Sequence, residues 1–177
     1  MNERRFFNAV TNSNEDILNR FLIILKKNKI SYCVLGGVAL NAYCEPILTL
    51  DFDCVISLNQ LEKLKSILKE EGFKFKSHPH TWEVKSKNSD LRIQIQKNGR
   101  YQDFIANSKE LKVLGYKMKI AKKEDLLRGK IWAYQDKKRN IIKREKDLLD
   151  IRRLIKKYPS LRKELPKEIL IKIEGRR

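Results

Sequence analysis

The spacing of apolar residues predicts strands alternating with helices over the first two thirds of the chain. Short apolar runs bounded by turn residues predict strands at residues 32–35, 49–57, 73–76, 81–86 and 91–96. Residues 113–120, which contain Gly115, are expected to form a last hairpin or strand, whereas the pattern at residues 101–108 leaves the type of element open. These runs predict one sheet.

Apolar residues at helical spacing fall between and after the predicted strands. Helices are expected at residues 17–28, 38–43 and 58–71, and the pattern is helical from residue 123 to about 158. Together the elements predict an α/β (α+β) fold, in which a mixed sheet is flanked by helices. We expect a core at residues 1–120 and a basic helical region at residues 121–177 packed on it.

A glycine pair ends the first predicted strand. Gly36 and Gly37 follow Leu35 directly, and the next helix is expected to begin at Val38. Glycines let the backbone approach an anion closely, and the first amides of a helix lack partners within it. Phosphate is therefore a candidate ligand, while the alternative is that the glycines only shape a tight turn.

Two carboxylates lie at the start of the next predicted strand. Asp51 and Asp53 are two residues apart, so their side chains leave a strand on the same face. Acids beside a buried strand are costly without a partner, and Mg²⁺ is the hard cation that prefers oxygen ligands. Metals about 3.5–4 Å apart are a common device for phosphoryl transfer. The alternative is a pair of turn or strand-edge carboxylates.

The series of strand, Gly-Gly, helix, strand and Asp-x-Asp resembles the nucleotidyltransferase superfamily with the polymerase-beta-like fold, including its minimal members. LGG ends at Gly37, and DFD spans Asp51 to Asp53. The resemblance implies that Asp51 and Asp53 hold Mg²⁺, in a one- or two-metal site. It also implies that Gly36, Gly37 and the Val38 amide cradle the triphosphate of an NTP, whose nucleoside monophosphate passes to an acceptor hydroxyl.

A second block, from IAKKEDLLRGK to KDLLDI, is similar to abortive-infection and toxin-type nucleotidyltransferases. Position by position, Lys130 matches a lysine that neutralises phosphate charge, and Asp147 and Asp150 match acids of the nucleotide site. The resemblance implies tRNA or another RNA as acceptor and an antitoxin protein as partner. In the alternative, Lys130 is a surface lysine and the two acids pair with bases on their own helix, namely Lys143, Arg144 or Arg153.

The third carboxylate that many such enzymes supply from a neighbouring strand is missing at the expected position. In LRIQIQ, strand alternation places Gln94 where the acid is expected. An amide oxygen can ligate a metal, but it does not accept a proton as a carboxylate does. Glu83 or Asp90 could substitute. Otherwise the domain is a non-catalytic nucleotide- or RNA-binding module, or an antitoxin-like subunit.

The composition adds a strong positive charge. The formal net charge is +18, and basic residues accumulate after Ile120, interleaved with apolar ones. Such a chain attracts polyanions, and RNA is the most common one available. Solvated helix faces, as in thermophile proteins, are the alternative.

The remaining features narrow the class of protein. No apolar run approaches the length of a membrane span, and the N-terminus has no secretory apolar segment, so we expect a cytoplasmic protein without a membrane partner. The three cysteines lack metal-ligand spacing and are expected to be reduced. His78 and His80 lack the further ligands that a zinc site needs.

Overall fold

The computed structural model describes residues 2–175 and divides into two compact units. The sheet unit comprises residues 2–42 and Pro46–Lys122, and the helical unit comprises Tyr43–Glu45 and residues 123–175. Within the described residues, none of the helices has both the length and the apolar character that a membrane crossing requires.

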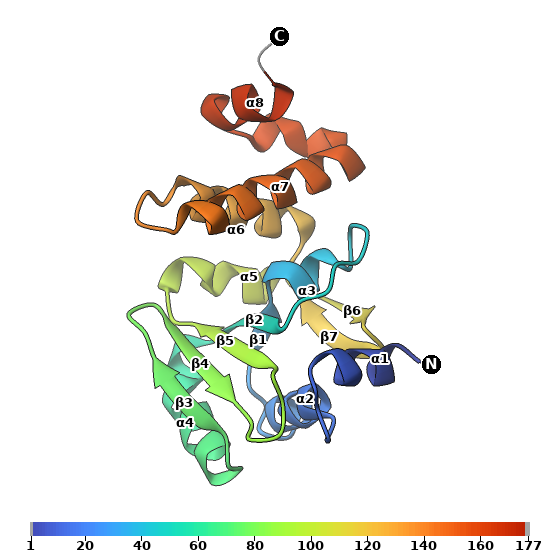
Figure 1. The fold of residues 1–177 in the computed structure, drawn as a ribbon. Helices are drawn as coiled ribbons and strands as arrows, with labels where there is room; N and C mark the ends of the chain where they lie inside the picture. The colour runs from blue at the N-terminus through green and yellow to red at the C-terminus, as the bar shows by residue number, and fades with distance from the viewer. Residues whose placement is uncertain (1, 176–177) are drawn as a thin grey trace. The chain divides into compact units, whose positions relative to one another are not determined.

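The sheet unit contains one mixed sheet, which confirms the predicted fold class (Figure 1). In the part of the chain that the structure describes, the strand order is β3-β4-β5-β2-β1-β7-β6. The strands are β1(Tyr32–Val34), β2(Asp51–Ile56), β3(Lys74–Ser77), β4(Thr81–Lys85), β5(Arg92–Gln96), β6(Lys109–Val113) and β7(Tyr116–Ile120). β2 runs parallel to β5 and β1 runs parallel to β7, whereas the other neighbours are antiparallel.

Helices connect the strands of this unit. They are α1(Glu3–Val10), α2(Ile17–Lys27), α3(Gly36–Leu40), α4(Leu61–Glu70) and α5(Gln102–Asn107), with short 3₁₀ turns η1(Leu58–Gln60) and η2(Gly99–Tyr101). The side chain of Asp16 caps α2 by accepting a hydrogen bond from the Asn19 amide at 3.1 Å. The same carboxylate accepts a hydrogen bond from the Tyr116 hydroxyl at 2.7 Å, which fixes the start of α2 to β7.

One face of the sheet is buried beneath helices and the other carries polar side chains. On β2, Phe52 and Cys54 are fully buried, and the Phe52 ring meets Phe21 of α2 edge-on at 6.0 Å. Trp82 of β4 lies on the same face, where Lys65 of α4 stands 5.2 Å from its ring. Because side chains alternate along a strand, the residues between these buried ones point to the opposite face.

The helical unit consists of α6(Lys123–Gln135), α7(Ile141–Lys157), η3(Pro159–Glu164) and α8(Lys167–Glu174). α6 and α7 pack on each other, and apolar residues such as Leu127, Leu148 and Ile151 are buried. Asn140 caps α7 by accepting a hydrogen bond from the Ile142 amide at 2.9 Å. This cap ends the connection from α6, so the long helical pattern of the sequence is two helices.

Candidate active site

The two aspartates of the DFD motif lie on the polar face of β2. Both are partly exposed, whereas Phe52 between them is fully buried. In the parallel pair formed with β5, Asp51 is opposite Arg92 and Asp53 is opposite Gln94. The predicted same-face geometry of the carboxylates is therefore present.

Arg92 contacts the first of these aspartates. Its Nε lies 2.7 Å from Oδ1 of Asp51, and the two side chains are 41% and 40% exposed. Although this distance makes an ion pair, the buried Nε does not reach hydrogen-bond geometry with any acceptor. The contact is thus electrostatic rather than a directed hydrogen bond.

The position of the expected third carboxylate is held by an amide with a fixed partner. Gln94 donates a hydrogen bond from Nε2 to Oε2 of Glu83 on β4 at 3.1 Å. Glu83 also pairs with Lys85 at 3.1 Å. Burial alone raises the pKa of Glu83, but the hydrogen bonds from Lys85 and Gln94 outweigh it and lower the pKa below its usual value. Glu83 is therefore ionised at neutral pH.

Gly36, the first glycine of the pair, is packed directly against the second aspartate. The Leu35 amide donates a hydrogen bond to the carbonyl oxygen of Asp53 at 2.8 Å, which holds the end of β1 beside β2. Gly36 then adopts a φ of +64°, a left-handed conformation that glycine adopts easily. A Cβ at Gly36 would overlap Oδ2 of Asp53 and lie 2.9 Å from its carboxyl carbon. Glycine is thus required here by both backbone and space.

The next two residues complete this turn. A Cβ at Gly37 would make only ordinary contact with Thr49, 3.5 Å from its Cγ2. Val38 is fully buried, so it can offer a ligand its backbone and not its side chain. The observed helix α3 begins at Gly36 itself, two residues before the predicted start at Val38.

The ligand set around the aspartates consists of oxygen atoms. Among residues 2–175, no group of three or more His, Cys, Asp and Glu side chains is arranged to hold a metal ion. What the face offers is the carboxylates of Asp51 and Asp53 and the carbonyl oxygen of Gln94. Carboxylate and amide oxygens suit Mg²⁺, and the missing side chain at Gly36 lets the Asp53 carboxylate lie directly against the backbone of the turn. The residues present therefore fit a hard divalent cation.

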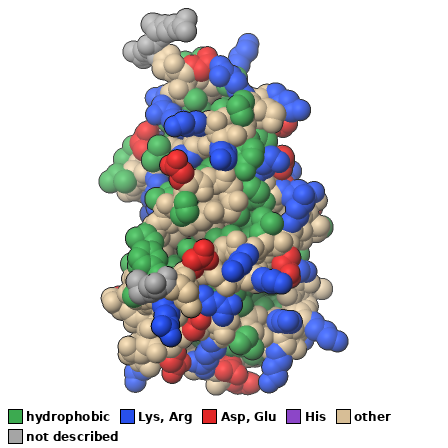
Figure 2. All heavy atoms as spheres, turned by 90° about the vertical axis from the view of Figure 1, so that its right-hand side faces the viewer, with side chains coloured by type: hydrophobic (Ala, Val, Ile, Leu, Met, Phe, Trp, Pro, Cys, Tyr) green, Lys and Arg blue, Asp and Glu red, His purple; other side chains and the backbone are tan. Residues whose placement is uncertain are grey.

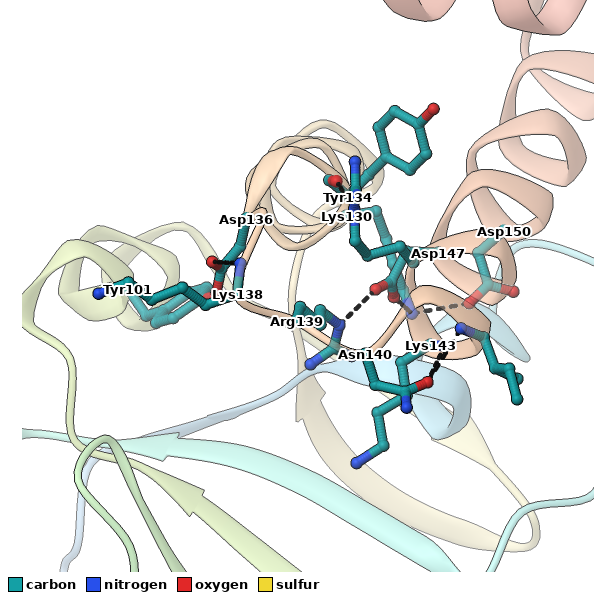
Figure 3. A network of polar contacts seen from close by, with 12 residues as sticks. Tyr101, Lys130, Tyr134, Asp136, Lys138, Arg139, Asn140, Lys143, Asp147 and Asp150 are labelled. Carbon is teal, nitrogen blue, oxygen red and sulfur yellow. Dashed lines mark hydrogen bonds and ion pairs between the residues drawn. The ribbon is translucent and has the colours of Figure 1, made fainter.

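The three predicted residues of the second block meet inside the helical unit. Lys130 of α6 reaches between two acids of α7, with Nζ 2.9 Å from Asp147 and 2.7 Å from Asp150 (Figure 3). Both aspartates are 2% exposed. Burial on its own lowers the pKa of Lys130, but the charges of Asp150 and Asp147 outweigh it and raise the pKa.

Two arginines occupy the remaining oxygens of these acids. Nε of Arg139 lies 2.8 Å from Oδ2 of Asp147, and Nη1 of Arg153 lies 3.0 Å from Oδ1 of Asp150. The Arg153 contact is the i, i+3 pair that the sequence suggested, whereas Arg139 comes from the connection between α6 and α7. Each carboxylate thus has two basic partners, so this network can stabilise the packing of α6 on α7.

We expect Lys130→Met to destabilise the protein by about 3–5 kcal/mol, because it leaves two buried carboxylates with less positive charge. Urea unfolding at pH 8 measures this loss. Because the folded-state pKa of Lys130 is raised, its contribution is fully present below the unfolded pKa and is lost as pH rises through the folded pKa. The difference in free energy of unfolding between Lys130→Met and the unaltered protein should therefore shrink above about pH 10.

The exposed Lys146→Met on α7 is a suitable control, since it removes the same charge from a side chain outside the network. A Lys130→Met protein that keeps full stability but loses nucleotide affinity would assign this lysine to phosphate instead.

Sequence reasoning missed Arg92 as a site residue. Alternation in LRIQIQ already placed it on the face of Gln94, but its contact with Asp51 depends on the register between β2 and β5. A basic residue two positions before the expected third ligand is the signal that could have identified it.

Comparisons with known proteins give matches by structure alone. No protein-family model and no curated protein matches this sequence. The lincosamide antibiotic adenylyltransferase LnuA, bound to lincomycin, is 19% identical with a TM-score of 0.56, over 81% of this chain and 97% of that one. ANT(2″)-Ia in complex with adenylyl-2″-tobramycin is 14% identical with a TM-score of 0.59, over 84% and 94%.

A third similar structure is an antigenic nucleotidyltransferase-like protein from Paracoccidioides brasiliensis. It is 21% identical with a TM-score of 0.51, over 77% of this chain and 73% of that one. These matches confirm the nucleotidyltransferase fold that the LGG and DFD motifs predicted.

Proposed function

We propose that this protein is a Mg²⁺-dependent nucleotidyltransferase that moves a nucleoside monophosphate from an NTP to an acceptor hydroxyl. The observation that carries the proposal is the contact of Gly36 with Asp53: on this fold, a left-handed glycine without a side chain lets the backbone pack directly against the carboxylate. A nucleotide's phosphates and a carboxylate-bound cation need such a close approach of backbone and acid.

Each residue of the site has a role in this proposal. Asp51 and Asp53 hold the cation, while Gly36, Gly37 and the Val38 amide cradle the triphosphate. When bound, Mg²⁺ supplies positive charge to the phosphate oxygens. A bond forms between the acceptor oxygen and the α-phosphorus, and pyrophosphate leaves.

The hydroxyl's proton passes to water in this scheme. Gln94 is a neutral amide, and the carboxylate to which it donates, Glu83, already accepts hydrogen bonds from Gln94 and Lys85. The protein's contribution is accordingly to position the reactants and stabilise charge rather than to act as a strong base.

The nucleotide contacts first predicted for Lys130, Asp147 and Asp150 are proposed only as a second role of the buried network. Lys130 would have to leave two carboxylates at 2.9 Å and 2.7 Å to meet a phosphate. The Lys130→Met measurement described above separates the structural role from the nucleotide role.

RNA is the acceptor that the charge distribution favours. Residues 123–177 contain 19 of the 40 Lys and Arg residues but only 9 of the 22 Asp and Glu residues. Lys and Arg side chains recur over the face of the molecule shown in Figure 2. The toxin-type resemblance points the same way, and an antitoxin would be the protein partner of such an enzyme.

The structure distinguishes arginines with internal partners from lysines that face solvent. Arg139 and Arg153 pair with buried acids, and Arg144 donates to the Tyr134 carbonyl at 2.6 Å. Five of the exposed lysines of this region are Lys137, Lys138, Lys143, Lys156 and Lys157. These lysines are the side chains proposed to meet RNA phosphates.

We expect the logarithm of tRNA affinity to fall linearly with the logarithm of the salt concentration. The slope should be about −0.7 for each single-strand phosphate contact. Substituting glutamine for the five exposed lysines should make the slope shallower, while nucleotide binding persists. A matched control replaces five exposed lysines of the sheet unit with glutamine: Lys26, Lys69, Lys74, Lys87 and Lys112. Equal losses in both variants would show that net charge alone, and not this region, binds RNA.

A small-molecule hydroxyl is the second candidate acceptor. It is favoured by LnuA and ANT(2″)-Ia, the antibiotic adenylyltransferase and the adenylyl-tobramycin complex to which this fold is similar over most of both chains. Incubating the protein with Mg²⁺, α-³²P-labelled NTPs and, in turn, total RNA, cell protein and aminoglycosides or lincosamides distinguishes the acceptors. Absence of label in every fraction would favour a non-catalytic nucleotide- or RNA-binding module.

A further inference from the structure

The polar face of the sheet carries two rows of charged and amide side chains that run across four strands. The strand pairing aligns Lys74, Lys85, Arg92 and Asp51 in one row. It aligns Lys76, Glu83, Gln94 and Asp53 in the other. The two aspartates therefore end rows whose neighbours are a cation and a neutral amide.

In the first row, a guanidinium already stands beside a proposed metal ligand. Nε of Arg92 is 2.7 Å from Oδ1 of Asp51, yet this buried nitrogen has no hydrogen bond. The pair neutralises charge without the directed, bidentate geometry that makes Arg–carboxylate pairs strong. Such a partner weakens the attraction of Asp51 for a metal ion, and a metal ion can displace it.

In the second row, Glu83 fixes the orientation of the amide. Because Nε2 of Gln94 donates to Glu83 on one side, the amide presents its carbonyl oxygen as the remaining acceptor. Gln94 can thus contribute a neutral oxygen beside Asp53, where a third carboxylate would add a negative charge. Glu83 itself has its charge balanced by Lys85 at 3.1 Å.

We propose that this site takes one divalent cation rather than two, and that Arg92 is the residue that limits its occupancy. The inference rests on the proposed function, since it concerns the same carboxylates. Asp51 and Asp53 provide two negative charges, Arg92 offsets one of them, and Gln94 adds none. The protein then carries too little negative charge to hold a second divalent ion, and the charge of a bound triphosphate serves the first cation.

A consequence is that cation and nucleotide bind cooperatively. The triphosphate brings the negative charge that Arg92 removes, so the cation binds weakly to the protein alone and tightly in the presence of an NTP. By linkage, the nucleotide gains the same factor in affinity from the cation.

Mn²⁺ binding, followed by electron paramagnetic resonance, tests the proposal without requiring turnover. With a non-hydrolysable NTP analogue, the unaltered protein should bind one Mn²⁺ per chain. Two ions per chain would overturn the proposal. This count does not depend on the folding of any variant.

Arg92→Gln should tighten Mn²⁺ binding to the nucleotide-free protein about tenfold, because a charge this close to a carboxylate shifts its affinity for a cation by at least that factor. Lys85→Gln is the matched control: Lys85 is 47% exposed, Arg92 is 41% exposed, and Lys85 pairs with Glu83 instead of Asp51. An equal effect of both substitutions, or none from Arg92→Gln, would contradict the role of Arg92.

Two further variants separate this inference from the proposed function. Gln94→Asp supplies the missing charge and should allow a second Mn²⁺ in the presence of the analogue; a count that stays at one would count against the charge argument. Asp51→Asn/Asp53→Asn should abolish Mn²⁺ binding. If that double variant binds Mn²⁺ normally, the proposed metal site itself is wrong, whereas failure of the Arg92 and Gln94 variants alone refutes only the single-cation inference.

Discussion

Asp51→Asn/Asp53→Asn should lower nucleotidyl transfer at least about 10³-fold while leaving the fold intact. Both carboxylates are proposed cation ligands, and electrostatic stabilisation of this kind contributes several kcal/mol to the barrier. The stability cost should be small, because the Asp51–Arg92 pair is about two-fifths exposed and exposed pairs contribute roughly 0–1 kcal/mol. Initial rates with α-labelled NTP and thermal unfolding measure the two quantities.

A control variant with the same change in charge is Glu62→Gln/Glu110→Gln. Both residues are exposed, and they lie on α4 and β6. Transfer by this control should stay within about twofold of the unaltered protein, since exposed charges away from a site contribute little. A double aspartate variant that retains the control's activity would remove Asp51 and Asp53 from the chemistry.

Gly36→Ala should impair both transfer and stability. The new methyl group would overlap the Asp53 carboxylate, and the backbone would be held at a φ of +64°. The conformation alone costs roughly 1–2 kcal/mol, and displacing the carboxylate adds to it. Because a misplacement of about 1 Å in an active site can cost about 10²-fold, we expect a loss of at least that size in transfer rate.

Gly72 and Gly37 provide the two controls for this prediction. Gly72, after α4, has a φ of +82°, and a Cβ there would meet no described atom within 4 Å. Gly72→Ala should therefore show the conformational cost without the loss of activity. Gly37→Ala should be tolerated structurally, since its Cβ makes ordinary contact with Thr49. If Gly36→Ala and Gly72→Ala affect transfer equally, the contact with Asp53 has no functional role.

The sequence predicted the fold because its signals are local. Alternation places Asp51 and Asp53 on one face whatever the strand pairs with, and Gly36 and Gly37 interrupt an apolar run. The helix start was placed two residues late, since a left-handed glycine within the first turn depends on the packing of β1 against β2. Residues 109–112 of β6 were missed as a strand because their polar, lysine-rich pattern suits an exposed edge.

Contacts between distant segments were beyond sequence reasoning. The i, i+3 pair of Asp150 and Arg153 was among the suggested alternatives, since both residues lie on one helix. The approach of Lys130 to the same acid required α6 to pack on α7. Likewise, the partner of Asp51 followed from pairing between strands that are some forty residues apart. Local rules thus found the carboxylates but not the charges that neutralise them.

The central claim is nucleotidyl transfer at Asp51 and Asp53, and two positions of the label in one NTP test it most directly. With Mg²⁺ and acceptor present, label from the α-phosphate should enter the acceptor, and label from the γ-phosphate should appear only in pyrophosphate. The double aspartate variant should transfer no α-label to the acceptor and release no labelled pyrophosphate. Entry of γ-label into the acceptor, or equal α-label transfer by Asp51→Asn/Asp53→Asn, would contradict the account.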